Sequence, residues 1–320
     1  MITVTIHESP RKASSEFDAL EQICSGSVRR NESLKRWTTF RCEAKADAIA
    51  SPKTIEMLTK LVDRLIAMKT TWRVLGRGSN LLVKDGGYPG ALVDLAVGFS
   101  AIAIENEDSR ETRVRVEGGV ANGTFLQWCR DRNLKGFGFS FGIPGSIGGG
   151  IRMNAGTPLG SFSQILREVE GLDFSRKVAH PTQLRVEEKD FLYRDFPKGH
   201  HLVITAGSFC LKKSDSASVN GEIEAAKDRR KNQPLELPNF GSVFKNPQGD
   251  FAGRLIEAAG LKGTRIGDAE ISRRHANFIV NLGRAKTADA LTLMSMAQET
   301  VQEKFGVKLE PEVHVIGVEA

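Results

Sequence analysis

The sequence predicts an α+β fold built from two or three packed units. A chain of 320 residues is long enough for that number of units. Short apolar runs typical of strands alternate with longer segments in which apolar residues recur at helical spacing. Two glycine-rich segments, residues 76–80 and 139–156, interrupt this alternation.

The first predicted unit has the order strand, helix, strand. Residues 1–36 are largely polar and irregular, with one short helix expected near residues 17–23, and we treat them as an N-terminal extension. A strand is expected over residues 46–50, and helical spacing of apolar residues follows over 53–68. Further short strands are expected over the ranges 72–75, 81–83 and 91–94.

Two further units are expected after residue 100. Strands at 113–117, 166–172 and 203–211 with a helix at 124–132 predict a second α+β unit. A long exposed helix over 218–231 leads into the third unit, which we expect to begin near residue 214. That unit contains helices over 251–259 and 287–305 and a strand over 277–281.

Composition indicates a globular protein of a reducing compartment. Hydrophobic residues make up 40% and charged residues 26% of the chain. No apolar run approaches the roughly 18–20 residues that a membrane span needs, and the first twelve residues lack the apolar core of a signal peptide. The scattered cysteines, Cys24, Cys42, Cys129 and Cys210, favour a cytoplasmic location without disulfides or zinc.

The net charge of +6 favours an anionic small ligand over nucleic acid. The basic residues are spread along the chain, and no aromatic residues interleave with the single cluster at 227–231, as a stacking platform for nucleic acid would require. We therefore expect phosphate-bearing small molecules, no nucleic acid and no membrane. His200 and His201 are candidate metal ligands, but adjacent histidines in a loop are more often solvated, so no metal is expected.

Both glycine-rich segments suit close approach to a ligand. The first could form a nest of N–H groups around phosphate oxygens, although a plain turn is an equal alternative. In the second, glycines permit close backbone approach, Pro144 fixes one φ angle, and interleaved isoleucines argue against a free linker. Such a segment suits an elongated cofactor with a pyrophosphate. The candidate cofactor-binding residues are Gly76, Arg77, Gly78, Ser79, Asn80, Gly142, Ile143, Pro144, Gly145, Ser146, Gly148, Gly149, Asn154 and Gly156.

A hydroxyl, a cation and an amide lie close together in the segment 239–247. Ser242, Lys245 and Asn246 could protonate a carbanion and hold an anionic substrate. Arg194 adds a guanidinium able to pair with a carboxylate, or alternatively a surface salt bridge to Asp190 or Asp195.

Several ordered motifs resemble the UDP-N-acetylenolpyruvoylglucosamine reductase (MurB) family over about residues 38–317. Each motif alone is weak, but the ordered set is specific. The matching segments are residues 75–83, 142–149, 153–156, 193–194, 233–234, 241–247, 252–257, 260–263, 275–281 and 312–313.

The resemblance implies a two-part FAD-binding domain of the vanillyl-alcohol-oxidase (PCMH) type, over residues 37–213 with subdomains divided near residue 100. A C-terminal α+β substrate-binding domain would follow over 214–320. It also implies noncovalent FAD, NADPH as hydride donor, and reduction of UDP-N-acetylglucosamine enolpyruvate to UDP-N-acetylmuramate in peptidoglycan precursor synthesis, a step of cell-wall biogenesis, cell shape and cell division.

The resemblance also implies roles for single residues. Arg194 would hold the substrate carboxylate, Ser242 would deliver a proton, and Glu312 would assist as a hydrogen-bond partner or acid, with Glu310 as a competitor for that role. Candidates for binding the rest of the substrate are Tyr193, Arg229, Lys245, Asn246 and Lys262.

Three departures from the family pattern affect the expected contacts. Arg41-Cys42-Glu43-Ala44 stands where a Gly-Gly pair is usual, Phe196 replaces a serine, and Thr157-Pro158-Leu159-Gly160 replaces an aromatic-glycine turn. The chain lacks room for the tyrosine-bearing substrate loop of one subclass, so it resembles the shorter, type II form.

Three other functions compete with this interpretation. One is another FAD-dependent oxidoreductase of the same flavin fold, although no histidine for covalent attachment lies in or beside the glycine-rich segments. A noncatalytic UDP-sugar or nucleotide-binding module is the second, and a basic nucleic-acid binder is the third. Bound flavin, visible in the absorption spectrum, would exclude the last two as sole functions.

Overall fold

The computed structural model describes residues 17–320, which form two compact units. The first sixteen residues of the predicted N-terminal extension lie outside this range. The first unit comprises the described residues up to Arg30 together with Ala48–Arg77 and Gly90–Arg230. The second comprises Asn31–Asp47, Gly78–Pro89 and Lys231–Ala320, so the chain passes between the units several times.

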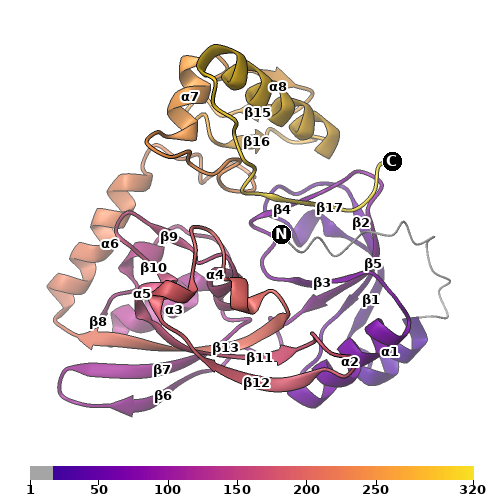
Figure 1. Ribbon diagram of the computed structural model, residues 1–320, viewed down its shortest axis with the longest axis vertical. Helices are drawn as coiled ribbons and strands as arrows, with labels where there is room; N and C mark the ends of the chain where they lie inside the picture. Colours follow the sequence, from indigo (N-terminus) through magenta and orange to yellow (C-terminus); the bar gives the residue numbers. More distant parts are fainter. Residues whose placement is uncertain (1–16) are drawn as a thin grey trace. The chain divides into compact units, whose positions relative to one another are not determined.

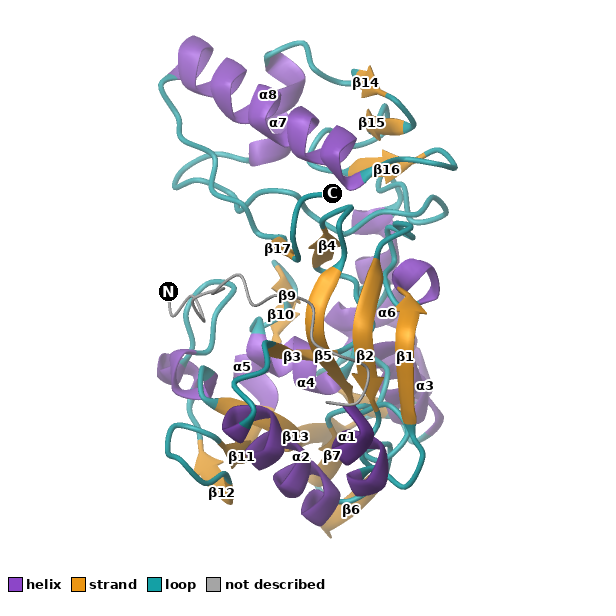
Figure 2. Cartoon of the chain, turned by 90° about the vertical axis from the view of Figure 1, so that its right-hand side faces the viewer, coloured by secondary structure: helices purple, strands orange, loops and turns teal. Residues whose placement is uncertain are grey.

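A four-stranded sheet of order β1-β2-β5-β3 is formed within residues 28–94. β3 and β5 are parallel, with Leu75 opposite Asp94. α2 begins after Thr54, whose Oγ1 accepts a hydrogen bond from the Met57 N–H at 3.2 Å. Figure 2 shows α1 beside α2, which packs its buried leucines against the alanines and valines of β2 and β5. The element bounds are α1 Asp18–Ile23, β1 Val28–Ser33, β2 Lys45–Ala50, α2 Ile55–Ala67, β3 Trp72–Leu75 and β5 Tyr88–Asp94.

A larger antiparallel sheet of order β12-β11-β13-β7-β6 forms the rest of the first unit. One face is covered by α3, α4 and α5 (Figure 1), and their apolar side chains join Val114 and Val116 of β7 in a core rich in phenylalanine. The element bounds are β6 Ile102–Glu107, β7 Glu111–Glu117, α3 Asn122–Asp131, β8 Leu134–Lys135, α4 Ile147–Arg152, α5 Phe162–Ile165, β11 Leu166–Asp173, β12 His180–Arg185, β13 Leu202–Lys213 and α6 Ser216–Arg230.

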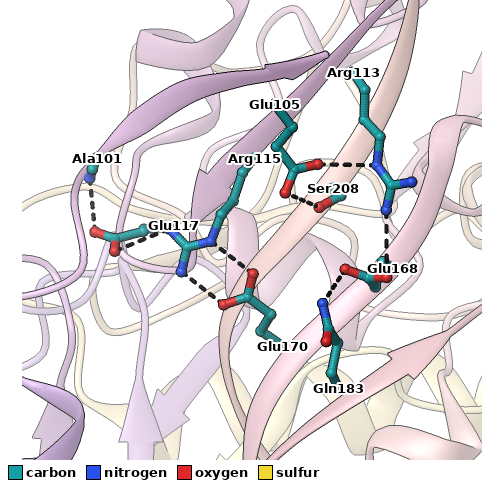
Figure 3. Close-up of polar contacts among 9 residues, drawn as sticks. All are labelled: Ala101, Glu105, Arg113, Arg115, Glu117, Glu168, Glu170, Gln183 and Ser208. Carbon is teal, nitrogen blue, oxygen red and sulfur yellow. Dashed lines mark hydrogen bonds and ion pairs between the residues drawn. The ribbon is translucent and has the colours of Figure 1, made fainter.

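The opposite face of this sheet carries a ladder of paired charges (Figure 3). Arg115 of β7 reaches Glu170 of β11 through two hydrogen bonds of 2.7 Å, and Arg113 reaches Glu105 of β6 at 3.0 Å. The alternation of valine and arginine along β7 thus puts apolar side chains into the core and charged ones on the outer face. We assign this ladder to cross-strand pairing of the sheet.

The second unit contains a parallel pair of β4 with β17 and a three-stranded sheet of order β14-β15-β16. Figure 2 shows α7 and α8 beside these three strands. Both carboxylate oxygens of Asp85 accept hydrogen bonds at 2.9 Å from the first N–H groups of α8, those of Thr287 and Ala288. The element bounds are β4 Leu81–Val83, α7 Ala252–Ala258, β14 Arg265–Ile266, β15 Ala269–Ile271, β16 Ile279–Asn281, α8 Thr287–Phe305 and β17 His314–Ile316.

Most of the predicted elements are observed, but the strands β6, β12, β14, β15 and β17 were not predicted, and three expectations are corrected. Residues 28–33, expected to be irregular, form β1, because pairing with β2 supplies the strand that their polar sequence does not indicate. The glycine-rich segment contains a short helix, α4, that periodicity did not reveal. α6, expected to be exposed, buries three side chains, those of Val219, Ile223 and Ala226.

Candidate functional site

The two glycine-rich segments meet in the first unit. A Cβ atom built on Gly76 would lie 3.0 Å from the hydroxyl of Ser146, seventy positions later in the chain. Ser146 is also the N-cap of α4, and its Oγ accepts a hydrogen bond from Gly149 at 3.4 Å. The end of β3 and the start of α4 are therefore parts of one local surface, as a single ligand contacting both would need.

Within the second segment, the glycines have two different surroundings. A Cβ on Gly148 would lie 3.2 Å from the carbonyl oxygens of Gly118 and Ile204, so this glycine packs against backbone. Gly149 is exposed, and the nearest atom to a Cβ there would be the Ser146 hydroxyl at 3.6 Å. Gly142 and Gly145 hold positive φ angles of 70° and 139°.

This exposed turn fits a cofactor that binds through backbone groups. Gly142, Pro144 and Gly149 are exposed, so the exposed side of the turn carries little side-chain bulk. N–H groups on such a surface suit pyrophosphate oxygens.

Residues 78–80 of the first segment belong to the second unit, whereas Arg77 belongs to the first. Gly78 has a φ of 60°, and a Cβ there would lie 2.1 Å from the carbonyl oxygen of Trp37, which only glycine avoids. Asn80 donates from Nδ2 to the carbonyl oxygen of Glu312 at 3.1 Å, and its own carbonyl accepts from His314 at 3.1 Å. Asn80 thus holds the segment that carries Glu312.

Arg194 lies in a tight turn of the first unit. Leu192 and Asp195 bridge the turn, and Arg194 takes a φ of 60°, which is unusual for a residue other than glycine. Its Nη2 donates to the carbonyl oxygen of Gly156 at 3.0 Å, and its Cζ lies 4.9 Å from the ring centroid of Tyr193. Together these features fix the orientation of a guanidinium that a strained backbone presents.

Asn154 ties this turn to the second glycine-rich segment. Its Nδ2 donates to the carbonyl oxygen of Leu192 at 3.2 Å, while its Oδ1 accepts from the N–H of Ser163 at 3.1 Å. Gly156, two residues after Asn154, provides the carbonyl oxygen that accepts the hydrogen bond from Arg194. Two candidate cofactor residues and the candidate carboxylate clamp are therefore neighbours.

The two carboxylates named as alternative partners of Arg194 have ion pairs with other residues. Lys198 pairs with Asp190 at 2.6 Å, and Arg152 pairs with Asp195 at 3.0 Å. Burial opposes ionisation of Asp195, but hydrogen bonds and charges from His200 and Arg152 outweigh it and hold the pKa of Asp195 below its usual range.

Phe196, which replaces the usual serine, is buried beneath the same turn. Its ring stacks on that of Phe191 with centroids 4.3 Å apart and planes at 15°. The replacement therefore supplies apolar support to the turn in place of a hydroxyl.

Ser242 and Glu312 lie on two hydrogen-bonded segments of the second unit. Phe244 lies opposite Pro311, the Glu312 N–H donates to the Val243 carbonyl at 2.9 Å, and the Lys245 N–H donates to the Glu310 carbonyl at 2.9 Å. Glu312 is therefore opposite Val243, next to Ser242, whereas Glu310 is opposite Lys245. Glu312 is half-buried, and the Glu310 side chain is 72% exposed.

Asn277 holds the segment that carries Ser242. Its buried side chain accepts from the Phe244 N–H at 3.0 Å and donates to the Phe244 carbonyl at 2.8 Å, and its carbonyl accepts from Val243 at 2.9 Å. Sequence reasoning quoted Asn277 within a family motif but assigned it no role. An asparagine directly before the apolar run Phe278 to Val280 is the sequence signal for a buried, hydrogen-bonded amide of this kind.

The other candidate substrate residues are distributed over both units. Asn246 accepts a hydrogen bond from Ala252 at the start of α7 at 3.1 Å, and Lys262 pairs with Glu257 at 2.9 Å. The ammonium of Lys245 lies 3.9 Å from the Glu310 carboxylate. Tyr193 and Arg229 are exposed in the first unit.

Within residues 17–320, no cluster of three or more histidine, cysteine or acidic side chains has the arrangement of a metal site. All four cysteines are free thiols. No helix of this range is long and apolar enough to cross a membrane.

Comparison with known proteins decides the family. The C-terminal domain model of UDP-N-acetylenolpyruvoylglucosamine reductase matches residues 233–316, and an FAD-binding domain model matches residues 46–175. UDP-N-acetylenolpyruvoylglucosamine reductase 2 of Symbiobacterium thermophilum is 39% identical over 91% of this chain and 93% of that protein. The reductase of Desulforamulus reducens is 38% identical over 93% of this chain and 96% of its own.

A solved structure agrees. The crystal structure of the reductase (MurB) from Thermus caldophilus superposes with a TM-score of 0.75 at 34% identity, over 90% of this chain and 98% of that one. The chain belongs to the UDP-N-acetylenolpyruvoylglucosamine reductase family.

Membership confirms the predicted fold and chemistry. The chain has a PCMH-type FAD-binding domain and the C-terminal domain of this family. It is a flavin-dependent oxidoreductase that uses FAD and NADPH to reduce the enolpyruvyl nucleotide in peptidoglycan precursor synthesis.

Proposed function

We propose that Arg194, Ser242 and Glu312 carry out this reduction on UDP-N-acetylglucosamine enolpyruvate, yielding UDP-N-acetylmuramate. The observation that carries the proposal is the pairing that puts Glu312 opposite Val243, the residue that follows Ser242. A proton donor and a second acidic group on paired segments suit protonation of a carbon.

The cofactor residues proposed are those of the two glycine-rich segments with Asn154 and Gly156. FAD bound there would pass a hydride from NADPH to the terminal carbon of the enolpyruvyl group. The local meeting of Gly76 with Ser146 supports this assignment. We further propose residues 37–213 as the FAD-binding domain and 214–320 as the substrate-binding domain.

The protein's own residues then complete the reduction. A new C–H bond at the terminal carbon moves the π-electron pair toward the adjacent carbon and its carboxylate. The guanidinium of Arg194 stabilises the charge on that carboxylate. Ser242 donates its hydroxyl proton to the adjacent carbon, Lys245 stabilises the alkoxide left behind, and solvent restores the proton. Glu312 assists as a hydrogen-bond partner or acid.

We propose that Tyr193, Arg229, Lys245, Asn246 and Lys262 bind the uridine diphosphate part of the substrate. Four of these side chains offer a cation or an amide donor to phosphate oxygens. The lack of a membrane-spanning helix in residues 17–320 and the four free thiols agree with a cytoplasmic location, which we propose.

The decisive experiment follows NADPH oxidation at 340 nm with and without the enolpyruvyl nucleotide. We expect rapid oxidation that depends on the nucleotide and a product in which the double bond is reduced. Oxidation that is indifferent to the nucleotide would instead favour a different flavin oxidoreductase.

A further inference from the structure

Arg230 is the last residue of α6 and has an unsatisfied buried group. Its Nε is inaccessible to solvent and has no hydrogen-bond partner among residues 17–320. The residue is half-buried, whereas the preceding Arg229 is exposed. A buried guanidinium N–H without an acceptor is costly, so its persistence calls for an explanation.

The positive charge of Arg194 adds to the free-energy cost of burying the Arg230 guanidinium. Burial and the positive charge of Arg194 together lower the pKa of Arg230 to about 10. Two guanidinium groups in the first unit, one at the end of α6 and one in the turn at 192–195, therefore act on each other through space. Like charges repel each other, and an anion bound by both would offset that repulsion.

Arg194 already has a fixed place in this pair. Its Nη2 donates to the carbonyl oxygen of Gly156, and its backbone is held at a positive φ. Arg230 belongs to a different element, α6, so donors from two separate parts of the first unit are available to one anion. A carboxylate has about four lone-pair sites, enough for donors from both guanidinium groups.

We propose that Arg230 binds the carboxylate of the enolpyruvyl group together with Arg194. This inference rests on the proposed function of Arg194. In it, the unpaired Nε of Arg230 donates to a carboxylate oxygen, and the charge that develops on the carboxylate during hydride transfer lies between two cations. The opposite assignment, to the diphosphate of the nucleotide, involves a related oxyanion and is distinguished by the test.

The test measures ligand binding by isothermal titration of the FAD-loaded enzyme. Two ligands are compared: enolpyruvyl-UDP-N-acetylglucosamine, and UDP-N-acetylglucosamine, which retains the diphosphate and lacks the carboxylate. Arg230→Met keeps the length and apolar stem of the side chain and removes the charge. Lys227→Met removes one positive charge from the same helix, where Lys227 is exposed and pairs with Glu224 at 3.2 Å.

Arg230→Met should weaken binding of the enolpyruvyl nucleotide by about 10- to 100-fold, the range for hydrogen bonds to charged groups. Binding of UDP-N-acetylglucosamine should change less than about twofold, and Lys227→Met should change neither. Equal weakening of both ligands would place Arg230 at the diphosphate and overturn the proposal, as would unchanged binding of both.

Two controls separate this result from other failures. The thermal midpoint of Arg230→Met should stay level or rise, because the variant removes a repulsive, unsatisfied cation. A marked fall would show a structural role and overturn the proposal. Wild-type NADPH oxidation with the enolpyruvyl nucleotide tests the proposed function itself, so failure of that function is recognised independently of Arg230.

Discussion

At the scale of single residues, the structure is compatible with two roles for Ser242: a residue of the turn, or the proton donor of the reaction. Gly241, with a φ of 82°, supplies the backbone freedom, and its N–H binds the side chain of Asn239 at 2.8 Å. Replacing Ser242 therefore leaves the turn in place. The hydroxyl alone is removed, which makes the substitution a clean test of chemistry.

Ser242→Ala should lower the rate at which pre-reduced enzyme is reoxidised by the enolpyruvyl nucleotide by on the order of 10²–10⁴, the range for general acid catalysis. Reduction by NADPH should continue at the wild-type rate, because no substrate carbon is protonated in that step. Rapid mixing followed at the oxidised-flavin absorption band measures both rates. Ser242→Cys should recover part of the loss, and the exposed Ser295→Ala should behave as wild type. Reoxidation of Ser242→Ala at the wild-type rate would leave Ser242 as a turn residue only.

His275 gives a residue-scale prediction about pH. Burial, with help from the charge of Lys262, lowers the pKa of His275 below 6.5. Its Nδ1 accepts the Asn277 N–H at 3.2 Å, so the folded protein favours the neutral ring. The unfolded chain takes up a proton near pH 6.5 while the folded chain resists it. Stability is therefore retained above about pH 6.5 and falls below it until the folded pKa is reached.

The stability gap between wild type and His275→Gln measures this effect. Near pH 7.5 the variant should be less stable, because it loses the edge contact with Phe278, whose ring centroid is 5.1 Å away. Below pH 6.5 the gap should narrow by up to about 1.4 kcal/mol per pH unit. Urea unfolding at pH 7.5 and pH 5.5 gives the two values. A gap that stays constant across this range would contradict the assignment.

At the scale of elements, the segment from Ser242 to Lys245 is held without belonging to a regular sheet. Its hydrogen bonds go to the Glu310–Glu312 segment and to the side chain of Asn277. Asn281 has a similar position in the same unit, with its buried amide bonded to the Phe40 carbonyl at 2.9 Å. Asn277 and Asn281 are equally buried, but their side chains bond to different segments, so each serves as a control for the other.

Asn277→Ala and Asn281→Ala should each lower the free energy of unfolding by about 2–4 kcal/mol, because each leaves buried backbone groups without partners. Only Asn277→Ala should speed amide hydrogen exchange at Val243 and Phe244. It should also slow reoxidation by the nucleotide, since the proton donor is held less firmly. Equal exchange at these two amides in both variants would mean that Asn277 stabilises the unit without orienting Ser242.

Elements were predictable where the signal is local. α2 and α8 follow helical spacing, and β7 alternates buried side chains with exposed or half-buried ones. α4 was missed because three consecutive glycines have poor helix propensity. Packing overrides that propensity, since a Cβ on Gly150 would lie 2.3 Å from the Phe162 ring.

Site residues, too, were predictable only where the signal is local. Motifs indicated which residues to consider. The hydrogen bonds from Arg194 to Gly156 and between Asn277 and Phe244, however, join segments far apart in the chain. The sequence indicated Arg229 as a substrate residue and did not single out Arg230, which belongs to the same basic cluster. The position of Arg230 at the end of α6, half-buried near Arg194, is visible only in three dimensions.

At the scale of the whole molecule, the chain passes several times between its two compact units. The first glycine-rich segment is one such crossing, with Arg77 in the first unit and Gly78 in the second. Candidate cofactor residues therefore belong to both units. Because a ligand that binds the folded state adds to its stability, FAD should raise the free energy of unfolding.

The purified protein should be yellow, carry about one FAD and release it on denaturation. Gly149→Val should weaken FAD binding, because Gly149 is exposed on the turn proposed to bind FAD and a branched side chain would occupy the space of a backbone contact. Gly148→Val is the contrasting variant, since its side chain would press on the Gly118 and Ile204 carbonyls. It should lower the thermal midpoint of the FAD-free protein, whereas Gly149→Val should leave that midpoint near wild type and reduce the rise that added FAD produces.

Absorbance near 450 nm and thermal unfolding with and without FAD measure these outcomes. If Gly149→Val binds FAD as tightly as wild type, the turn at 142–149 serves the fold alone and the cofactor lies elsewhere.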